Sequence, residues 1–241
     1  MQNSDFDSSL IKKDFAQKIV SRFVDYIELD DDFKDEFSIK ELTIHAYFDY
    51  NDDEILLDAK YYLDGDEIDE KSVIDNNFIS KKYSHFCSII NSLGFTKNKI
   101  SDINLIGNFL TSDLQILQKH CEIFLSDNIK KMTIKRMNKI KSNISYNSGM
   151  LDVCFENLNF SNEELSKILK GIKKKVKYVK LSKNIIFDIN NDEAKQFFEL
   201  VEEFNLDQNN LTGKQSIPLY QGLKLMSNDH DFQNVNIDEN I

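Results

Sequence analysis

The stretch Leu42–Leu63, LTIHAYFDYNDDEILLDAKYYL, alternates apolar and polar side chains on both sides of a short polar turn. Successive side chains of a β-strand point to opposite faces, so this alternation is typical of two half-buried strands. The stretch therefore predicts a β-hairpin that turns at Asn51-Asp52-Asp53. The apolar positions of the two strands are Leu42, Ile44, Ala46, Phe48, Tyr50, Ile55, Leu57, Ala59, Tyr61 and Leu63.

The residues before the hairpin have a helical period instead. Apolar side chains recur at every fourth position from Ile11 to Ile27, which predicts an amphipathic helix over about residues 8–29. The acidic stretch LDDDFKDEF then ends the pattern. We assign residues 1–37 to this helix and an acidic linker. The first fifteen residues have acids near Met1 and no apolar core, so we expect no secretory signal.

Helices and strands mix in the residues that follow the hairpin. The segment 79–93 predicts a helix that ends at Gly94, and EIFLS at 122–126 predicts a strand. INLIG at 103–107 also predicts a short strand, and 109–121 predicts a helix.

The C-terminal half opens with a second predicted hairpin, which turns at Asn147-Ser148-Gly149. Ser161 and Glu164 have the spacing of a capping box, and the helix they open has an apolar stripe. Two strands, 176–181 and 184–189, precede a helix over 192–204 and a shorter one over 219–225. The tail from Ser227 is polar, and we expect it to fray. The stripe consists of Leu165, Ile168, Leu169 and Ile172.

Strands and helices are mixed without strict βαβ alternation, so we predict an α+β fold with antiparallel hairpins. We divide the chain after the N-terminal helix into residues 38–145, 146–227 and a polar tail, 228–241. No apolar run reaches the length that spans a membrane, so we expect no membrane partner. Three cysteines far apart suit a reducing cytoplasm.

Charge is distributed unevenly along the 241 residues. The whole chain has a formal charge of −11, yet residues 129–183 hold fourteen basic and four acidic side chains, which leaves −21 for the rest. Such a basic segment indicates a face for nucleic-acid backbone, a docking face that pairs with the acidic part of the same chain, or a solvated face. Lys173, Lys174 and Lys175, in the last turn of the helix that Ser161 opens, also complement its dipole. The candidate contact residues are Lys130, Lys131, Lys135, Arg136, Lys139, Lys170, Lys173, Lys174, Lys175 and Lys177.

Two short motifs are similar to nucleotide-binding motifs but lack required residues. LTGKQS at 211–216 has Gln208 where a phosphate loop needs glycine, and Gln215 where the loop needs Ser or Thr for magnesium. DEAK at 192–195 resembles the acidic box of helicase ATPases, but it opens a helix, where acids favour the dipole.

No metal site is expected either. The acids at 64–70 lack the glycine position of a calcium loop. His85 with Cys87, and His120 with Cys121, have spacings that do not direct both side chains to one metal. We therefore predict no catalytic, cofactor-binding or metal-binding residue in this chain.

The segment 151–206, LDVCFENLNFSNEELSKILKGIKKKVKYVKLSKNIIFDINNDEAKQFFELVEEFNL, resembles the helicase-associated accessory domain of bacterial Swi/Snf-family helicases. A strand, an E-E-L helix, a lysine-rich turn, a hairpin and a further helix follow in the order of that family. The hairpin 45–68, the phrase EIFLSDNIKKM at 122–132 and SIPLYQGLKL at 216–225 are similar in kind. The similarity covers most of residues 38–227.

The chain also departs from the family. Asn184 replaces the hairpin glycine, and Ser80-Lys81-Lys82 stands where an Arg-Asp pair is usual. The ATPase motor and the upstream cysteine-histidine zinc module are missing. The resemblance therefore implies a non-catalytic accessory domain of an ATP-dependent DNA helicase or translocase, with ATP and Mg belonging to the absent motor. It implies a cytoplasmic bacterial protein, with association with the nucleoid as an option.

The partner that this resemblance implies is a Swi/Snf-type motor of the same polypeptide, positioned or regulated by domain contacts. The alternative is a nucleic-acid-binding module that uses the basic region 130–183 and binds DNA weakly and without sequence preference.

Overall fold

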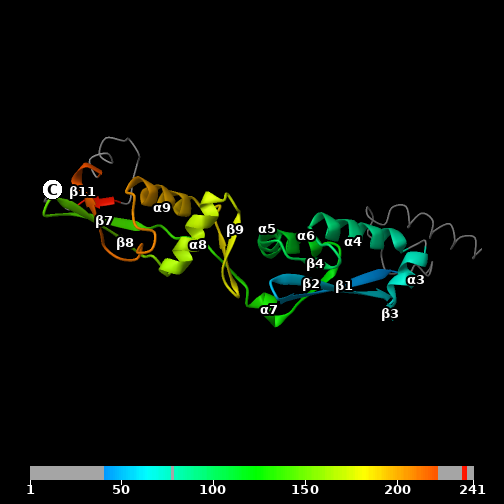
Figure 1. Ribbon diagram of the computed structural model, residues 1–241. Coiled ribbons are helices and arrows are strands. Elements are labelled where there is room, and N and C mark those ends of the chain that lie inside the picture. The colour runs from blue at the N-terminus through cyan, green and yellow to red at the C-terminus, as the bar shows by residue number, and fades with distance from the viewer. Residues whose placement is uncertain (1–40, 77–78, 222–234, 238–241) are drawn as a thin grey trace, which may run out of the picture. The chain divides into compact units, whose positions relative to one another are not determined.

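The computed structural model describes residues 41–76, 79–221 and 235–237, the last three by their backbone alone (Figure 1). The chain forms two compact units, Met1–Lys130 and Lys131–Ile241. The boundary that we placed after residue 145 falls within strand β7, Lys141–Asn147. The predicted helix over 8–29 and its acidic linker lie outside the described residues.

The first unit is a mixed sheet with α4, α5 and α6 over one face (Figure 1). Its strands lie in the order β3-β2-β1-β5, with β4 also paired to β2. The strands are β1 (Leu42–Asn51), β2 (Glu54–Leu63), β3 (Asp66–Ile68), β4 (Lys99–Ile100) and β5 (Glu122–Leu125). The helices are α3 (Glu70–Asp75), α4 (Ser80–Ser92), α5 (Ile103–Asn108), the π-helix η1 (Phe109–Asp113), α6 (Leu114–Leu117) and α7 (Asp127–Lys130).

The predicted hairpin is confirmed. β1 and β2 pair antiparallel from Leu42 opposite Leu63 to Asn51 opposite Glu54. The turn residues Asp52 and Asp53 have φ of 48° and 67°, as a two-residue turn that matches the strand twist requires. Every predicted apolar position of β1 is buried, and the ring of Phe48 lies 4.9 Å from that of Phe109.

One prediction in this unit was wrong. INLIG is the helix α5 and not a strand. The Asp102 carboxylate accepts hydrogen bonds from the amides of Asn104 and Leu105, at 2.8 and 3.1 Å, and so caps the helix. Ile106 and Phe109, three residues apart, are both buried, which is the spacing of a helix. The predicted helix over 109–121 is confirmed as far as α6, and EIFLS forms β5 as predicted.

The second unit has two sheets and two principal helices. One sheet has the order β6-β10-β9 and the other β11-β8-β7-β12. The strands are β6 (Thr133–Lys135), β7, β8 (Met150–Glu156), β9 (Tyr178–Ser182), β10 (Ile185–Asp188), β11 (Gln215–Pro218) and β12 (Val235–Ile237). The helices are α8 (Asn162–Lys173) and α9 (Asp192–Glu203). The mixture of helices with antiparallel hairpins confirms the predicted α+β class.

The hairpin β7-β8, the strands β9 and β10 and the helices α8 and α9 are confirmed in this unit. Leu219, Tyr220 and Gln221 are helical, and the rest of that predicted helix lies outside the described residues. The expected fraying of the tail was wrong for Val235–Ile237, because these residues pair in parallel with β7 as β12.

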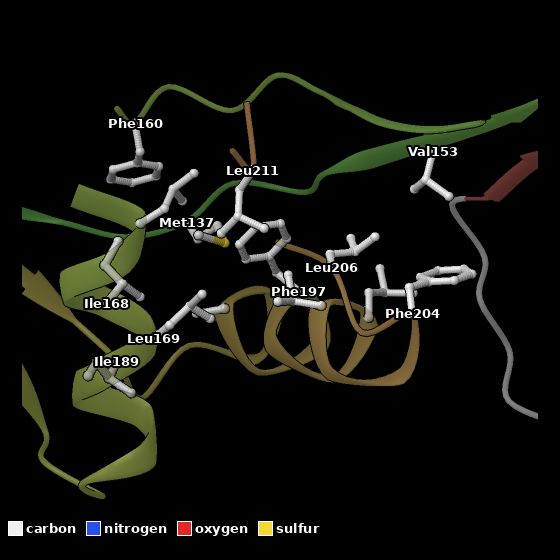
Figure 2. Packing of buried hydrophobic residues seen from close by; sticks show 14 of the residues in the cluster. Met137, Val153, Phe160, Ile168, Leu169, Ile189, Phe197, Phe204, Leu206 and Leu211 are labelled. Atoms are coloured by element: carbon white, nitrogen blue, oxygen red, sulfur yellow. The ribbon is translucent and has the colours of Figure 1, made fainter. Parts of the chain in front are cut away.

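The capping box that begins α8 is complete. The Glu164 amide donates to Oγ of Ser161 at 3.2 Å, and the Ser161 amide donates to the Glu164 carboxylate at 2.8 Å. Leu169 of α8 and Phe197 of α9 belong to one buried apolar cluster, which Figure 2 shows between the two helices. The cap therefore begins α8 at the residue that turns its apolar stripe toward the core.

Gly171 lets α8 approach β9 closely. A Cβ atom on Gly171 would overlap Cγ2 of Val179 and lie 2.6 Å from Cδ1 of Ile189. Real Cβ atoms do not approach other atoms so closely, so either the helix or the side chains of Val179 and Ile189 would have to shift. A glycine inside a helix costs about 1 kcal/mol relative to alanine, and here the close packing offsets that cost.

We expect Gly171→Ala to lower the free energy of unfolding by about 1 kcal/mol or more. Overpacking costs about 1–3 kcal/mol, which exceeds the gain in helix propensity. Chemical denaturation of both proteins measures this difference. Lys170→Ala, at the exposed neighbouring position of α8, is the control and should change the stability little. A more stable Gly171→Ala protein would show that α8 and β9 are not in close contact.

Candidate interaction surfaces

The LTGKQS segment is a turn held by hydrogen bonds between the Gln215 side chain and the backbone before it. The Gln215 side chain accepts a hydrogen bond from the Asp207 amide at 2.7 Å and donates to the Asp207 and Asn210 carbonyl oxygens at 3.2 and 2.9 Å. The Thr212 amide donates to Oδ1 of Asn162 at 3.0 Å. These contacts occupy the residue that replaces the magnesium-binding Ser or Thr of a phosphate loop.

Lys214 is held by a buried carboxylate. Its Nζ lies 2.7 Å from Oδ2 of Asp152, whose side chain is 3% exposed. Oδ2 also accepts from the Asn147 amide group at 3.2 Å, and the Ser216 hydroxyl donates to Oδ1. Hydrogen bonds from Lys214 and Ser216 lower the pKa of Asp152 from 3.8 to about 2. The lysine that a phosphate loop would use thus has a structural partner.

The other motifs have structural roles as well. The Asn191 side chain accepts from the Ala194 amide at 2.9 Å and caps α9, so DEAK is the first turn of a helix. Asp69 caps α3 in the same way through the Ser72 amide at 2.8 Å. In the part of the chain that the structure describes, no group of three or more His, Cys, Asp or Glu side chains could hold a metal ion.

The structure brings together His85 and His120, which belong to two separate His/Cys pairs of the sequence. The rings of His85, on α4, and His120, after α6, lie 5.0 Å apart in an edge-to-face arrangement. Their separation of 35 residues gives no local signal of this contact. Burial raises the pKa of the neighbouring Cys121 thiol to about 11, so this cysteine is a poor nucleophile and metal ligand near neutral pH.

Four of the candidate basic residues contact other groups of the protein. Arg136 donates to Oδ2 of the buried Asp188 from Nε at 3.1 Å and from Nη2 at 3.0 Å. Lys173 pairs with Glu202 at 2.9 Å. Lys135 and Lys177 lie over aromatic rings, of Phe160 and Tyr178 respectively, at 5.7 and 5.1 Å from the centroids. Two of these contacts are ion pairs, so part of the excess positive charge is compensated within the protein.

The remaining candidates lie on separate elements. Lys170, Lys174 and Lys175 are exposed at the C-terminal end of α8. Lys130 ends α7 in the first unit, whereas the exposed Lys131 and Lys139 belong to the second. Three of the remaining candidates thus gather at the end of α8.

Sequence reasoning missed an aromatic surface on the first unit. The side chains of His45, Tyr47, Tyr62 and Phe124 lie on one face of the sheet, opposite the buried side chains of β1, and we call this the aromatic face. Tyr47 and Phe124 stack with centroids 4.7 Å apart, and the His45 ring lies 4.3 Å from Tyr62 and 5.1 Å from Phe124. The alternation of β1 indicated the first two residues, but only the pairing of β5 with β1 adds Phe124.

A family model described as bacterial SNF2 helicase associated matches residues 4–241. The chain belongs to this family, as the resemblance predicted, and the family is a helicase-associated domain and not the motor. No curated protein and no solved structure matches the chain. Among the described helices, none is long and apolar enough to cross a membrane.

The depressed pKa of Asp152 makes a prediction about acid stability. Its ion pair with Lys214 contributes fully above pH 3.8, and the contribution is lost as the pH falls through about 2. We expect Asp152→Asn to be less stable than the wild type at pH 7, with a difference that shrinks between these two values. Urea denaturation at a series of pH values tests this. Glu199→Gln, at an exposed position of α9, is the control; a pH-independent difference for Asp152→Asn would contradict the ion-pair explanation.

Proposed function

We propose that this chain is a non-catalytic accessory domain that binds a SNF2-type ATPase motor and positions or regulates it through domain contacts. The observation that carries the proposal is the family match, which extends over residues 4–241. The motor is expected in the same polypeptide, and ATP and magnesium would bind there. The contacts of Lys214 with Asp152 support a structural role for the motif most similar to a nucleotide site.

The proposal predicts direct binding between this chain and the motor when the two are expressed separately. We expect a Kd of about 10⁻⁵ M or tighter, because covalent linkage would normally supply an effective concentration near the millimolar range. Isothermal titration calorimetry measures the Kd, and DNA-stimulated ATP turnover of the motor with and without the chain measures regulation. The chain alone should turn over no ATP.

Two results would contradict this function. If the motor neither binds the chain nor changes its ATP turnover, the proposed contact does not exist. If the purified chain hydrolyses ATP and Lys214→Ala abolishes that activity, the chain is an enzyme and the interpretation of the LTGKQS turn is wrong.

Nucleic-acid binding is the second candidate, because the exposed lysines at the end of α8 are available to phosphates. The net charge of −11 repels a polyanion at long range, so we expect a Kd for duplex DNA no tighter than about 10⁻⁵ M at about 150 mM salt. Replacing Lys170, Lys174 and Lys175 by glutamine should leave this Kd nearly unchanged. Fluorescence anisotropy with a labelled duplex is the measurement. Submicromolar binding that these replacements abolish would make DNA the ligand of this surface.

A further inference from the structure

The aromatic face lies on the side of the sheet opposite the core, where polar side chains are usual. β1 buries its even-numbered side chains, from Leu42 to Tyr50, so His45 and Tyr47 point to the opposite side. Register places Phe124 of β5 beside Tyr47, and Glu122 beside His45. Phe124 is 39% exposed, and Leu56 on the same side of β2 is 37% exposed. The ring contacts of His45, Tyr47, Tyr62 and Phe124 extend across β2, β1 and β5, so these four side chains form one continuous group.

Polar side chains are usual on the outward face of an amphipathic sheet, so a group of rings there is unusual. Single exposed apolar side chains are normal, but a contiguous group of rings with a polar rim is typical of an interaction site. Tyrosine and phenylalanine are enriched at protein interfaces because they bury a large area at a small cost in side-chain entropy. The contacts among the rings also hold them in place before any partner binds, which lowers the cost of ordering.

The rim of this surface is acidic. Asp58 lies opposite Tyr47 in the β1-β2 register and is exposed. Glu122, whose side chain is 60% exposed, lies 3.3 Å from the His45 imidazole. Lys60 on the same face pairs with Glu67 at 3.4 Å, so its charge is compensated. Carboxylates around exposed rings repel phosphates and attract cations, which also bind favourably over aromatic faces.

We propose that the aromatic face binds a segment of the SNF2-type motor that carries arginine or lysine beside aliphatic side chains. The aliphatic side chains pack on Tyr47 and Phe124, while the cationic groups lie over the rings and pair with Asp58 and Glu122. This inference rests on the proposed function and adds to it the location and the chemistry of the contact. It assigns the motor to the first unit and leaves the lysines of α8 outside the contact.

The test combines charge reversal on the rim with the separately expressed motor. In the double variant Asp58→Lys/Glu122→Lys, two exposed carboxylates become cations that repel a basic partner, and the rings remain. We expect the Kd for the motor to rise about tenfold or more, with a weaker dependence on salt. Circular dichroism and thermal unfolding verify that the variant is folded.

Two control variants separate this surface from the rest of the chain. Asp75→Lys reverses an exposed charge at the end of α3 and should leave the Kd unchanged. Lys170→Gln/Lys174→Gln/Lys175→Gln should also leave it unchanged. Phe124→Ser, which removes the most exposed ring without a change of charge, should weaken binding in parallel with the double variant.

The outcomes distinguish this inference from the proposed function. If the wild type binds the motor and the double variant and Phe124→Ser bind it equally well, the inference is wrong and the proposed function stands. If the wild type does not bind the motor, both fail. A labelled dT15 oligonucleotide provides the last comparison. If the wild type binds it and Phe124→Ser loses that binding, the aromatic face is a stacking platform for single-stranded nucleic acid, which overturns the inference.

Discussion

Two-residue turns with left-handed backbone at both central positions set the register of three hairpins, and the rest of each unit depends on that register. Asp52 and Asp53 have φ of 48° and 67°, and Ser148 and Gly149 have φ of 50° and 85°. Asp64 and Gly65, between β2 and β3, follow the same rule. Because side chains alternate along a strand, a slip of one residue would exchange the core face for the opposite face. The turns therefore determine which residues form the core and, equally, which residues form the aromatic face.

The sequence predicted the parts of the fold that rest on local physics. The hairpin at 42–63, the capping box of α8 and the helix α9 each have a period or a cap within about twenty residues. The missed parts depend on distant contacts. The parallel pairing of β5 with β1 joins residues about 77 apart, and no local pattern indicates a partner so far away. The short run INLIG had an ambiguous period, and its cap at Asp102 decided in favour of a helix.

The charge pattern shows what a sequence conceals about a surface. Fourteen basic residues in 129–183 indicated a strongly positive face, but the count does not reveal their partners. Arg136 compensates the buried Asp188, and removing either residue of such a pair leaves an unfavourable buried charge or an unpaired cation. Lys214, outside that segment, compensates the charge of the buried Asp152 in the same way. Part of the positive charge is therefore required by the fold and is unavailable to a ligand, which sequence alone could not show.

The aromatic face and the end of α8 share a physical property that follows from these constraints. The side chains of both surfaces lie outside the hydrophobic core. The aromatic face uses the outward-facing residues of β1, and the lysines follow the apolar stripe of α8. Substitutions there leave the buried faces intact, and distant sites contribute to stability almost additively. Gly171 has the opposite property, because a side chain there would overlap Val179 and crowd Ile189. Substitutions at these two surfaces therefore test binding without altering the core, whereas Gly171→Ala alters the packing of α8 on β9.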